Sequence, residues 1–136
     1  MTTPRQPPSA ALTPVAELLG RRLLHLDPES GKASLEFLAR PEFANRYGTV
    51  QGGVLAAMLD SAAGATLMAY LPPDLTAVTV QLNTSFLKPA PVGPLRGSAR
   101  VLAKDERSAE LEAEIITPDD VVVARATAYF RIFQRK

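Results

Sequence analysis

The sequence predicts one α+β domain in which an antiparallel β-sheet covers a single long helix. The chain has 136 residues, which is the size of one domain with one hydrophobic core. One apolar segment, residues 53–71, has the length of a long helix, and the chain after it alternates apolar and polar residues as half-buried strands do. Connections at residues 104–107 and 118–120 are too short for the crossover between parallel strands, so the strands that they join must be antiparallel.

The part of the chain before the long segment predicts a short helix and a hairpin. Thr13 followed by Pro14 is typical of a helix start, and Gly20 is typical of a helix end. Residues 21–27 and 32–39 predict two strands, because both runs are rich in strand-forming residues and turn-forming residues separate them. We expect these strands to pair as a hairpin.

The long apolar segment has clear boundaries. Residues 40–52 are irregular and form a loop in which functional groups are expected. Pro72 and Pro73 end the segment, because proline cannot continue a helix. The segment is long enough to cross a membrane, but Asp60 near its middle and its many Gly and Ala residues favour the buried helix of a soluble domain.

Each run after the long helix has one apolar face. The apolar positions are Val78, Val80 and Leu82, then Ala109, Leu111, Ala113 and Ile115, and finally Val122, Ala124, Ala126, Ala128 and Phe130. A sheet with one apolar face must cover that face, and residues 53–71 are the only element of sufficient length and hydrophobicity. We therefore expect three or four strands after the helix, with the sheet curved around it.

Composition excludes several classes of function. The chain has 15 Lys and Arg and 14 Asp and Glu, and a net charge of +1 gives no general attraction to nucleic acid or to an anionic membrane. Without cysteine there is no disulfide, thiol nucleophile or thiolate metal site, which fits a cytoplasmic protein. The single histidine, His25, excludes most histidine-based metal centres. Residues 1–11 lack the apolar core of a signal peptide and are expected to be a mobile tail before a domain of residues 12–136.

Asp60 is the most informative residue of the long helix. Its helical neighbours are all small: Gly53, Ala56, Ala57, Ala63 and Gly64. The carboxylate therefore lies on a smooth stripe that a backbone or a ligand could approach closely. The alternative is that the small residues only seat the helix against a second helix, with Asp60 exposed or paired to an arginine.

Two glycines at the start of the helix favour the functional interpretation. Gly52 and Gly53 let a ligand oxygen come close to free N–H groups at the positive end of the helix. Such a helix start can stabilise a developing oxyanion, and a carboxylate two turns further along can activate water or attack a carbonyl. These are the two parts that acyl transfer requires.

A run that begins in the loop and enters the helix, NRYGTVQGGVLAAMLDSA, resembles the signature of a known enzyme family. That family is the hotdog-fold acyl-CoA thioesterases of the phenylacetate-degradation type, within the 4-hydroxybenzoyl-CoA thioesterase superfamily. The spacing matches at five positions: Asn45, Gly48, Gly52, Gly53 and Asp60. The later run TVQLNTSFLKPAPVG resembles the family's next strand and its exit turn, so the resemblance covers most of the chain beyond about residue 12.

By this resemblance the fold is a hotdog, in which a curved antiparallel sheet wraps one long helix. The substrate is expected to be an acyl or aroyl thioester of coenzyme A, with no metal and no separate cofactor, because coenzyme A is part of the substrate. The active unit is expected to be a homo-oligomer, either a homodimer or a homotetramer built as a dimer of dimers, with its sites at the subunit interface. In relatives the loop and helix start come from one subunit and the carboxylate from the other, so monomers are expected to be inactive.

The resemblance also implies roles for individual residues. Asp60 is similar in position to the general base or nucleophile of the family, and the N–H of Gly52 or Gly53 to the main oxyanion donor. Asn45 is expected to hold the attacking water or the thioester. Thr79 falls where many relatives have a hydroxyl residue that helps to place the water.

Position 51 departs from the family pattern, because this sequence has Gln51 where the common pattern has His. An amide can still donate a hydrogen bond to a thioester carbonyl. It cannot supply or take a proton near neutral pH as His can. Gln51 is therefore expected either to polarise the thioester or only to anchor the loop.

Two further groups of residues have a functional and a structural interpretation. Four basic residues are candidates for binding the coenzyme A phosphates, with ordinary solvated charge as the alternative: Lys88, Arg96, Arg100 and Arg107. Four apolar residues are candidates for an acyl pocket, although residues at such spacings are usually core: Met58, Met68, Phe86 and Phe130. We expect these four to be structural.

Four functions compete at this point. The first is hydrolysis of an acyl-CoA, with Asp60 as base or nucleophile. The second is a hotdog protein that binds acyl-CoA without cleaving it, which Gln51 favours and the presence of Asp60 opposes. The third is a dehydratase or hydratase, which would need a histidine near the helix start that the sequence lacks. The fourth is an obligate structural subunit with no affinity for coenzyme A.

Overall fold

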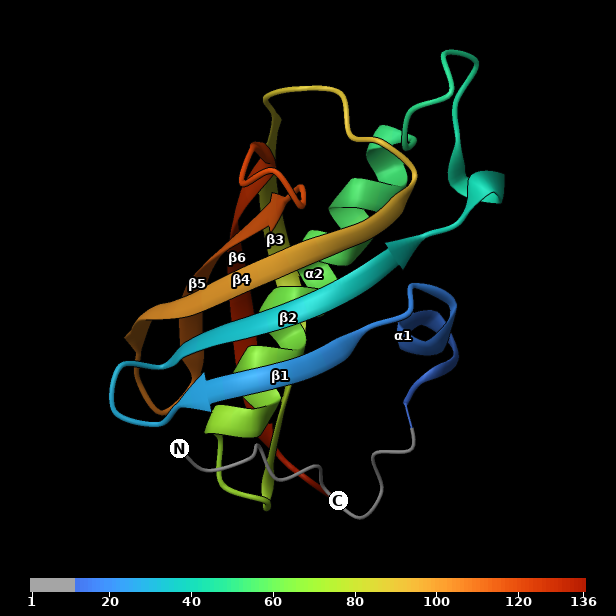
Figure 1. Cartoon of the computed structure of the whole chain (residues 1–136). Helices are drawn as coiled ribbons and strands as arrows, with labels where there is room; N and C mark the ends of the chain where they lie inside the picture. The colour runs from blue at the N-terminus through green and yellow to red at the C-terminus, as the bar shows by residue number, and fades with distance from the viewer. Residues whose placement is uncertain (1–11) are drawn as a thin grey trace.

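The computed structural model describes residues 12–136, which form an antiparallel six-stranded sheet curved around one long helix (Figure 1). In chain order the elements are α1 (Pro14–Leu18), β1 (Arg22–Asp27), β2 (Lys32–Ala39), the short 3₁₀ helix η1 (Pro41–Phe43), α2 (Gly52–Tyr70), β3 (Leu75–Phe86), β4 (Gly93–Lys104), β5 (Ser108–Ile116) and β6 (Val122–Gln134). The strand order across the sheet is β1-β2-β4-β5-β6-β3. The predicted fold class is confirmed. The expected tail, residues 1–11, lies outside the described residues.

The connections between strands agree with the sequence-based expectations. β1 pairs with β2, β4 with β5 and β5 with β6, each as antiparallel neighbours joined by a short turn. Four strands follow the long helix, which is the larger of the two expected numbers. The helix itself begins at Gly52 and ends at Tyr70, one residue earlier at each end than the sequence predicts.

The short helix α1 begins at a capping side chain, ends at a glycine and is joined to β2 by a backbone hydrogen bond. The Thr13 side chain accepts a hydrogen bond from the Ala16 N–H at 3.2 Å, as an N-cap does. Gly20 ends the helix at a φ of 64°, and a Cβ there would lie 2.9 Å from the Leu38 Cβ, so only glycine fits. The Leu38 N–H donates to the Leu19 carbonyl, which joins the end of α1 to β2.

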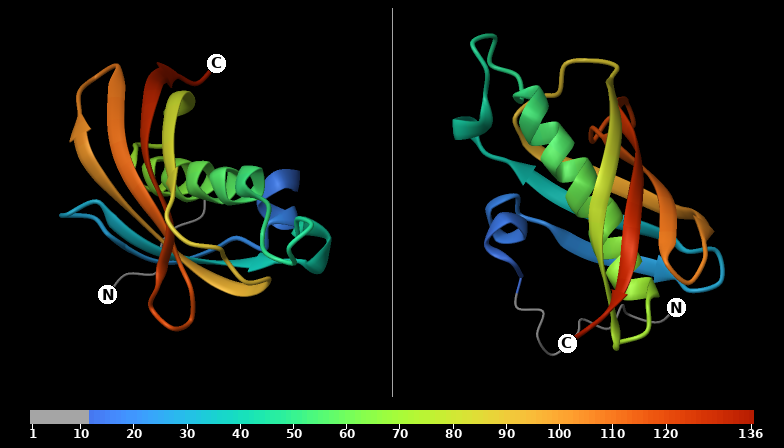
Figure 2. Two further views of the ribbon diagram at one scale, coloured as in Figure 1. Left: turned by 90° about the horizontal axis from the view of Figure 1, so that it is seen from above. Right: turned by 180° about the vertical axis from the view of Figure 1, so that it is seen from behind.

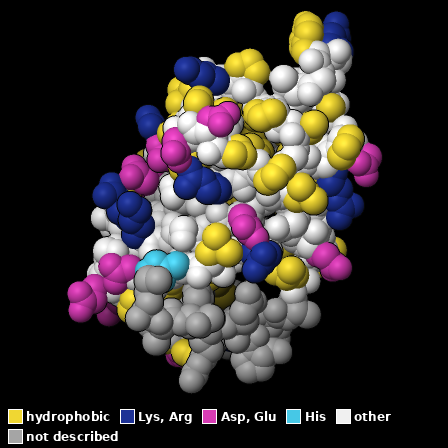
Figure 3. Space-filling model, in the orientation of Figure 1, with side chains coloured by type: hydrophobic (Ala, Val, Ile, Leu, Met, Phe, Trp, Pro, Cys, Tyr) yellow, Lys and Arg dark blue, Asp and Glu magenta, His cyan; other side chains and the backbone are white. Residues whose placement is uncertain are grey.

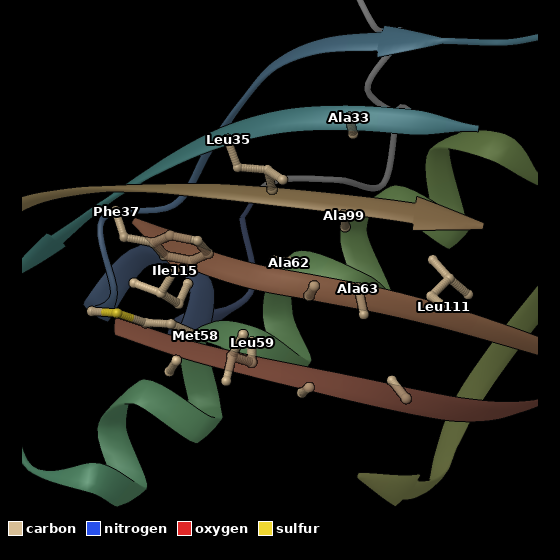
Figure 4. Packing of buried hydrophobic residues seen from close by; sticks show 14 of the residues in the cluster. Ala33, Leu35, Phe37, Met58, Leu59, Ala62, Ala63, Ala99, Leu111 and Ile115 are labelled. Carbon is tan, nitrogen blue, oxygen red and sulfur yellow. The ribbon is translucent and has the colours of Figure 1, made fainter. Parts of the chain in front are cut away.

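The core lies between α2 and the concave face of the sheet. The bulky side chains of the helix, including Leu55, Met58, Leu59 and Leu67, are at most 3% exposed. Figure 4 shows Met58 and Leu59 facing side chains of the sheet. Many sheet residues that face the helix are small, which lets the two elements approach closely: Ala33, Ala99, Ala109, Ala113, Ala124, Ala126 and Ala128. By length and composition α2 could cross a membrane, but its position inside the sheet is that of a core helix.

The register of β3 corrects one prediction. Strict alternation predicts Val78 and Val80 on the apolar face, yet these side chains are 51% and 59% exposed. The pairing with β6 shifts between Thr79 and Gln81, which is the signature of a β-bulge. Thr79 pairs with the buried Phe130 and therefore lies on the helix side of the sheet. Because of the bulge, Thr79 faces the helix, whereas strict alternation predicts that Val78 and Val80 do.

The sheet leaves one side of α2 uncovered. β1 and β3 are the two edge strands, and in the view from behind α2 runs between α1 and β1 on one side and β3 on the other (Figure 2). Five residues along this side are only partly buried: Ala57, Asp60, Ser61, Gly64 and Met68. We call these five residues the open side of α2.

The convex face of the sheet carries both signs of charge. Figure 3 shows basic and acidic side chains interspersed over the strands in this orientation. Cross-strand pairs account for part of this pattern, for example Arg100 with Glu112 at 2.8 Å and Arg125 with Glu114 at 2.6 Å. Since these pairs are largely solvent-exposed, they add little to stability, and they leave no large basic surface on this face.

Candidate active site

Asp60 lies on the open side of α2 and has one hydrogen-bond partner from the sheet. The Thr79 hydroxyl donates to the Asp60 Oδ1 at 2.7 Å. The contact depends on the bulge in β3, because the bulge turns Thr79 toward the helix. Of the sequence-predicted site residues, these two are therefore brought together. One carboxylate oxygen is held by the hydroxyl, and Oδ2 is left for a water or a substrate.

The start of α2 is free to bind an anion. No side chain caps the helix, and no hydrogen bond to the N–H of Gly52 or Gly53 is found among the described residues. The Gln51 carbonyl accepts from the Val54 and Leu55 N–H groups, and its own N–H donates to the Phe43 carbonyl. The backbone of Gln51 therefore anchors the loop, while its exposed side chain makes no cap bond. Two N–H groups point outward at the positive end of the helix.

The loop before α2 is held together by hydrogen bonds and projects beyond the helix start (Figure 1). Asn45 organises it: its Nδ2 donates to the Thr49 Oγ1 at 3.0 Å, and its Oδ1 accepts from the N–H groups of Tyr47 and Thr49. Gly48 permits the turn with a φ of 79°. The Tyr47 side chain at the tip is 80% exposed. In this chain the Asn45 side chain thus holds the loop, and its contact with a substrate stays a prediction.

The carboxylate and the helix start are far apart within one chain. Gly52 and Asp60 are separated by eight residues of continuous helix. At the α-helical rise this is about 12 Å along the axis. A reacting carbonyl must lie roughly 3 Å from both its attacking group and its oxyanion donors. One chain therefore cannot bring Asp60 and the Gly52 N–H to the same carbonyl.

The four basic candidates do not form one cluster. Arg96 pairs with Asp120, and Arg100 pairs with Glu112, both on the convex face. Arg107 lines a surface groove of about 540 Å³ together with Lys104 and Arg131.

Arg96 lies near the start of β4, and Lys104, which lines the groove, is the last residue of the strand. The two residues are eight positions apart, or roughly 26 Å along the strand. Lys88 is exposed and follows the end of β3. Two residues earlier, the Phe86 ring would lie 3.5 Å from a Cβ at Gly52, so this segment passes the start of α2. Lys88 and Arg96 are therefore the basic candidates on the side of the helix start.

The apolar candidates divide into two groups. Met58 and Phe130 are buried core residues, as expected. Met68 is partly buried on the open side of α2. The expectation for Phe86 is wrong, because its ring is 54% exposed beside the helix start. The strand pattern could not reveal this, since Phe86 is the last residue of β3, where the alternation ends.

Comparison with known proteins agrees with this arrangement of loop, helix and strands. The model of the thioesterase superfamily matches residues 47–124, more than half of the chain, and the match includes Gly52, Asp60 and Thr79. The chain belongs to the thioesterase superfamily. The resemblance stated from the loop and helix residues is therefore confirmed.

Individual known proteins are similar to this chain over most of its length. The phenylacetic acid degradation-related protein of Ralstonia eutropha JMP134 has 36% identity and a TM-score of 0.85, with 90% of this chain and 93% of that chain covered. Rv1847 of Mycobacterium tuberculosis H37Rv, whose name assigns it to the esterases, is 33% identical over 87% of this chain and 85% of its own length.

A third relative, the BH2602 protein of Bacillus halodurans, was solved with CoA. It has 28% identity and a TM-score of 0.70, with 74% of this chain and 66% of that chain covered. The chain spans 85% of the length of Rv1847, and 62% of the length of another relative, the esterase-named protein VNG_1336C of Halobacterium salinarum.

Sequence reasoning missed one polar contact of this thioesterase fold. The Arg21 Nη1 donates to the Ser61 Oγ at 3.0 Å, and Ser61 is the residue after Asp60 on the open side of α2. Burial lowers the pKa of the Arg21 guanidinium from its usual value. No sequence signal distinguishes Arg21 from Arg22 beside it, because the direction of each depends on the turn at Gly20.

Proposed function

We propose that the protein is an acyl-CoA thioesterase that hydrolyses an acyl- or aroyl-CoA to a free acid and coenzyme A. The thioester carbonyl is bound by the N–H of Gly52 or Gly53, which stabilises the oxyanion as it develops. Asp60 acts as general base for water or as nucleophile. Thr79 is a positioning residue, because its hydroxyl holds one oxygen of Asp60 at 2.7 Å.

The separation of about 12 Å between Asp60 and the helix start carries this proposal. Both groups have the chemistry for thioester cleavage, and neither completes a site within one chain. If a second copy of the chain places the start of its own α2 near this Asp60, both groups can reach the same thioester carbonyl. The active unit is therefore a homodimer or a dimer of dimers, with the carboxylate and the oxyanion donors of each site on different subunits.

The exposed edge of β3 is the surface that suits a second copy. β3 is an edge strand of 12 residues whose outer backbone groups have no partner strand among the described residues. Val78 and Val80 on this strand are 51% and 59% exposed, which is unusual for a long edge that must avoid aggregation. Pairing of two β3 edges would give these valines side-chain neighbours on the partner strand and bring the neighbouring Thr79 and Asp60 to the interface.

Two glycines of α2, Gly53 and Gly64, leave room for a partner chain or a substrate to come close to the helix. A Cβ built at Gly53 or at Gly64 would meet no atom within 4 Å. The chain itself therefore does not require glycine at either position. Gly64 lies on the open side of α2, one turn beyond Asp60, where a partner backbone or a substrate would come close.

Coenzyme A binding is assigned to exposed basic residues around the site. Lys88 follows the segment that passes the helix start, so it is the first candidate for a phosphate contact. Arg107, with Lys104 and Arg131, lines the groove of about 540 Å³ and is the second. Arg96 is the third, although its pairing with Asp120 must open for it to bind a phosphate. The reaction is expected to take place in the cytoplasm, where the acyl-CoA pool lies.

Release of thiol from a panel of short, medium, long and aromatic acyl-CoAs tests the proposal. Wild type should release coenzyme A from at least one substrate class, and Asp60→Ala and Asp60→Asn should not. The elution volume in size-exclusion chromatography should be the same for all three proteins. Turnover that survives both substitutions would contradict the role of Asp60.

The second candidate function is a protein that binds acyl-CoA without cleaving it. Gln51 favours this alternative, because a neutral amide at the helix start can bind the thioester carbonyl but cannot transfer a proton. Binding of acyl-CoA without release of thiol from any substrate would support it. In that case Gln51→His should introduce turnover.

A further inference from the structure

Arg21 is a partly buried cation that uses little of its hydrogen-bonding capacity within residues 12–136. Its one hydrogen bond with a described residue is the 3.0 Å contact from Nη1 to the Ser61 Oγ. A guanidinium has five N–H donors, and burial makes unused donors costly. Burial also lowers the pKa of this guanidinium, although an arginine stays protonated at neutral pH.

No carboxylate of this chain pairs with Arg21. Four ion pairs are found among residues 12–136, and none of them includes Arg21. Residues 1–11 contain no Asp and no Glu, so they cannot supply a side-chain carboxylate. The neighbouring Arg22 differs sharply, because its side chain is 71% exposed and pairs with Glu36 at 2.6 Å.

The position of Arg21 relative to Asp60 decides what it can bind. Ser61 is adjacent to Asp60, and both lie on the open side of α2. Thr79 reaches this side from β3, and Arg21 reaches it from the opposite edge, between α1 and β1 (Figure 2). Successive Cα atoms are about 3.8 Å apart, so the hydroxyl that Arg21 contacts belongs to the residue next to the proposed base.

Resting on the proposed thioesterase function, we infer that Arg21, held by Ser61, binds a carboxylate at the far end of the acyl group. The substrates of this site are then short dicarboxylic acyl-CoAs, in which one carboxyl forms the thioester and the other pairs with the guanidinium. The coenzyme A phosphates are unsuitable as the bound anion, because the pantetheine arm separates them from the reacting carbonyl. A guanidinium and a carboxylate form the strong, bidentate pair that such recognition needs.

Binding in an inactive background tests this inference. In Asp60→Asn protein, isothermal titration calorimetry should measure the dissociation constants of glutaryl-CoA and pentanoyl-CoA, which have equal acyl length and differ by one carboxylate. Glutaryl-CoA should bind about ten- to a hundredfold more tightly, as expected for a charge-assisted pair. Arg21→Met should abolish the difference, and Arg21→Lys should retain part of it. Arg22→Met is the matched control and should leave both constants unchanged.

Turnover in the Asp60-containing protein gives a second readout. Wild type should have the higher kcat/KM for glutaryl-CoA, and Arg21→Met should lower that value by a much larger factor than it changes kcat/KM for pentanoyl-CoA. Enzyme-free hydrolysis is subtracted for each substrate.

Three results would overturn the inference. Equal binding of the two acyl-CoAs to the Asp60→Asn protein would remove the carboxylate subsite, and hydrolysis of pentanoyl-CoA by wild type would then leave the thioesterase proposal intact. Dissociation of the oligomer by Arg21→Met, with Arg22→Met still associated, would make Arg21 an ion-pair partner of the second copy. Failure of both acyl-CoAs to bind or react would overturn the inference, and the proposed function would fall with it only if no other acyl-CoA of the panel released thiol.

Discussion

The two sides of α2 differ in burial, in polarity and in the size of their side chains, although their residues alternate along one continuous helix. The sheet-facing side has Leu55, Met58, Leu59 and Leu67, which are at most 3% exposed and apolar. The open side has Asp60 and Ser61 among small residues, and each of the two accepts a hydrogen bond from outside the helix. The first side stabilises the fold and the second presents reactive groups. Residues that are adjacent in sequence should therefore have separable effects on stability and on turnover.

Asp60→Asn should have the largest effect on turnover and almost none on folding. The amide keeps the size of the side chain and can still accept from the Thr79 hydroxyl, but it cannot act as base or nucleophile. We expect kcat to fall by about a hundred- to ten-thousandfold. Urea unfolding should give a free energy of unfolding close to that of wild type. A large loss of stability would contradict the separation of the two sides.

Gly52→Pro should be the second most damaging change to turnover. Position 52 is the first residue of α2, where proline is well tolerated, and Gln51 has the extended backbone that the residue before proline prefers. The substitution therefore removes one N–H donor and little else.

Loss of one oxyanion donor should lower kcat by about a hundred- to a thousandfold. Gly52→Ala is the matched control, because it keeps the N–H, and its Cβ would contact the Phe86 ring at an ordinary 3.5 Å. Equal activity of the two variants would assign the oxyanion contact to another donor.

Leu59→Ala should have the opposite profile to Asp60→Asn. The Leu59 side chain is fully buried against the sheet, so its removal leaves a cavity. We expect the free energy of unfolding to fall by about 2 to 5 kcal/mol. The kcat of the folded protein, measured well below its melting temperature, should stay within about twofold of wild type, since a core residue makes no contact with the substrate. A hundredfold loss of kcat would show that the sheet-facing side also sets the geometry of the site.

Thr79→Val should have the smallest effect. Valine has the shape of threonine without the hydroxyl, so it removes only the 2.7 Å hydrogen bond to Asp60. A hydrogen bond to a charged group is worth about 1.5 to 3 kcal/mol, and in a partly exposed site water replaces much of it. We expect kcat to fall by roughly three- to tenfold with KM nearly unchanged. Thr79→Ser should restore the wild-type value, because it restores the donor.

The sequence predicted the structure best where the spacing of residues along the chain determines which residues lie next to one another. The position of Asp60 among small residues follows from helical periodicity, which also predicts the helix to within one residue at each end. The antiparallel hairpins follow from short connections. Sequence reasoning failed at β3, because a single inserted residue at Val80 changes the face of every residue before it, and nothing in the composition of the strand marks the bulge. Arg21 was missed for a related reason, since the turn at Gly20 determines which side it reaches.

The most direct test of the account is a mixed oligomer of two inactive variants, Asp60→Asn and Gly52→Pro. The two chains are expressed together with different affinity tags, purified through both tags, and compared with each variant alone. If the carboxylate and the oxyanion donors come from different subunits, each mixed dimer contains one site with neither substitution, and about half of the wild-type activity should return. If Asp60 and Gly52 serve the same site within one chain, every site in the mixed dimer carries a substitution, and activity at the level of the single variants would contradict the account.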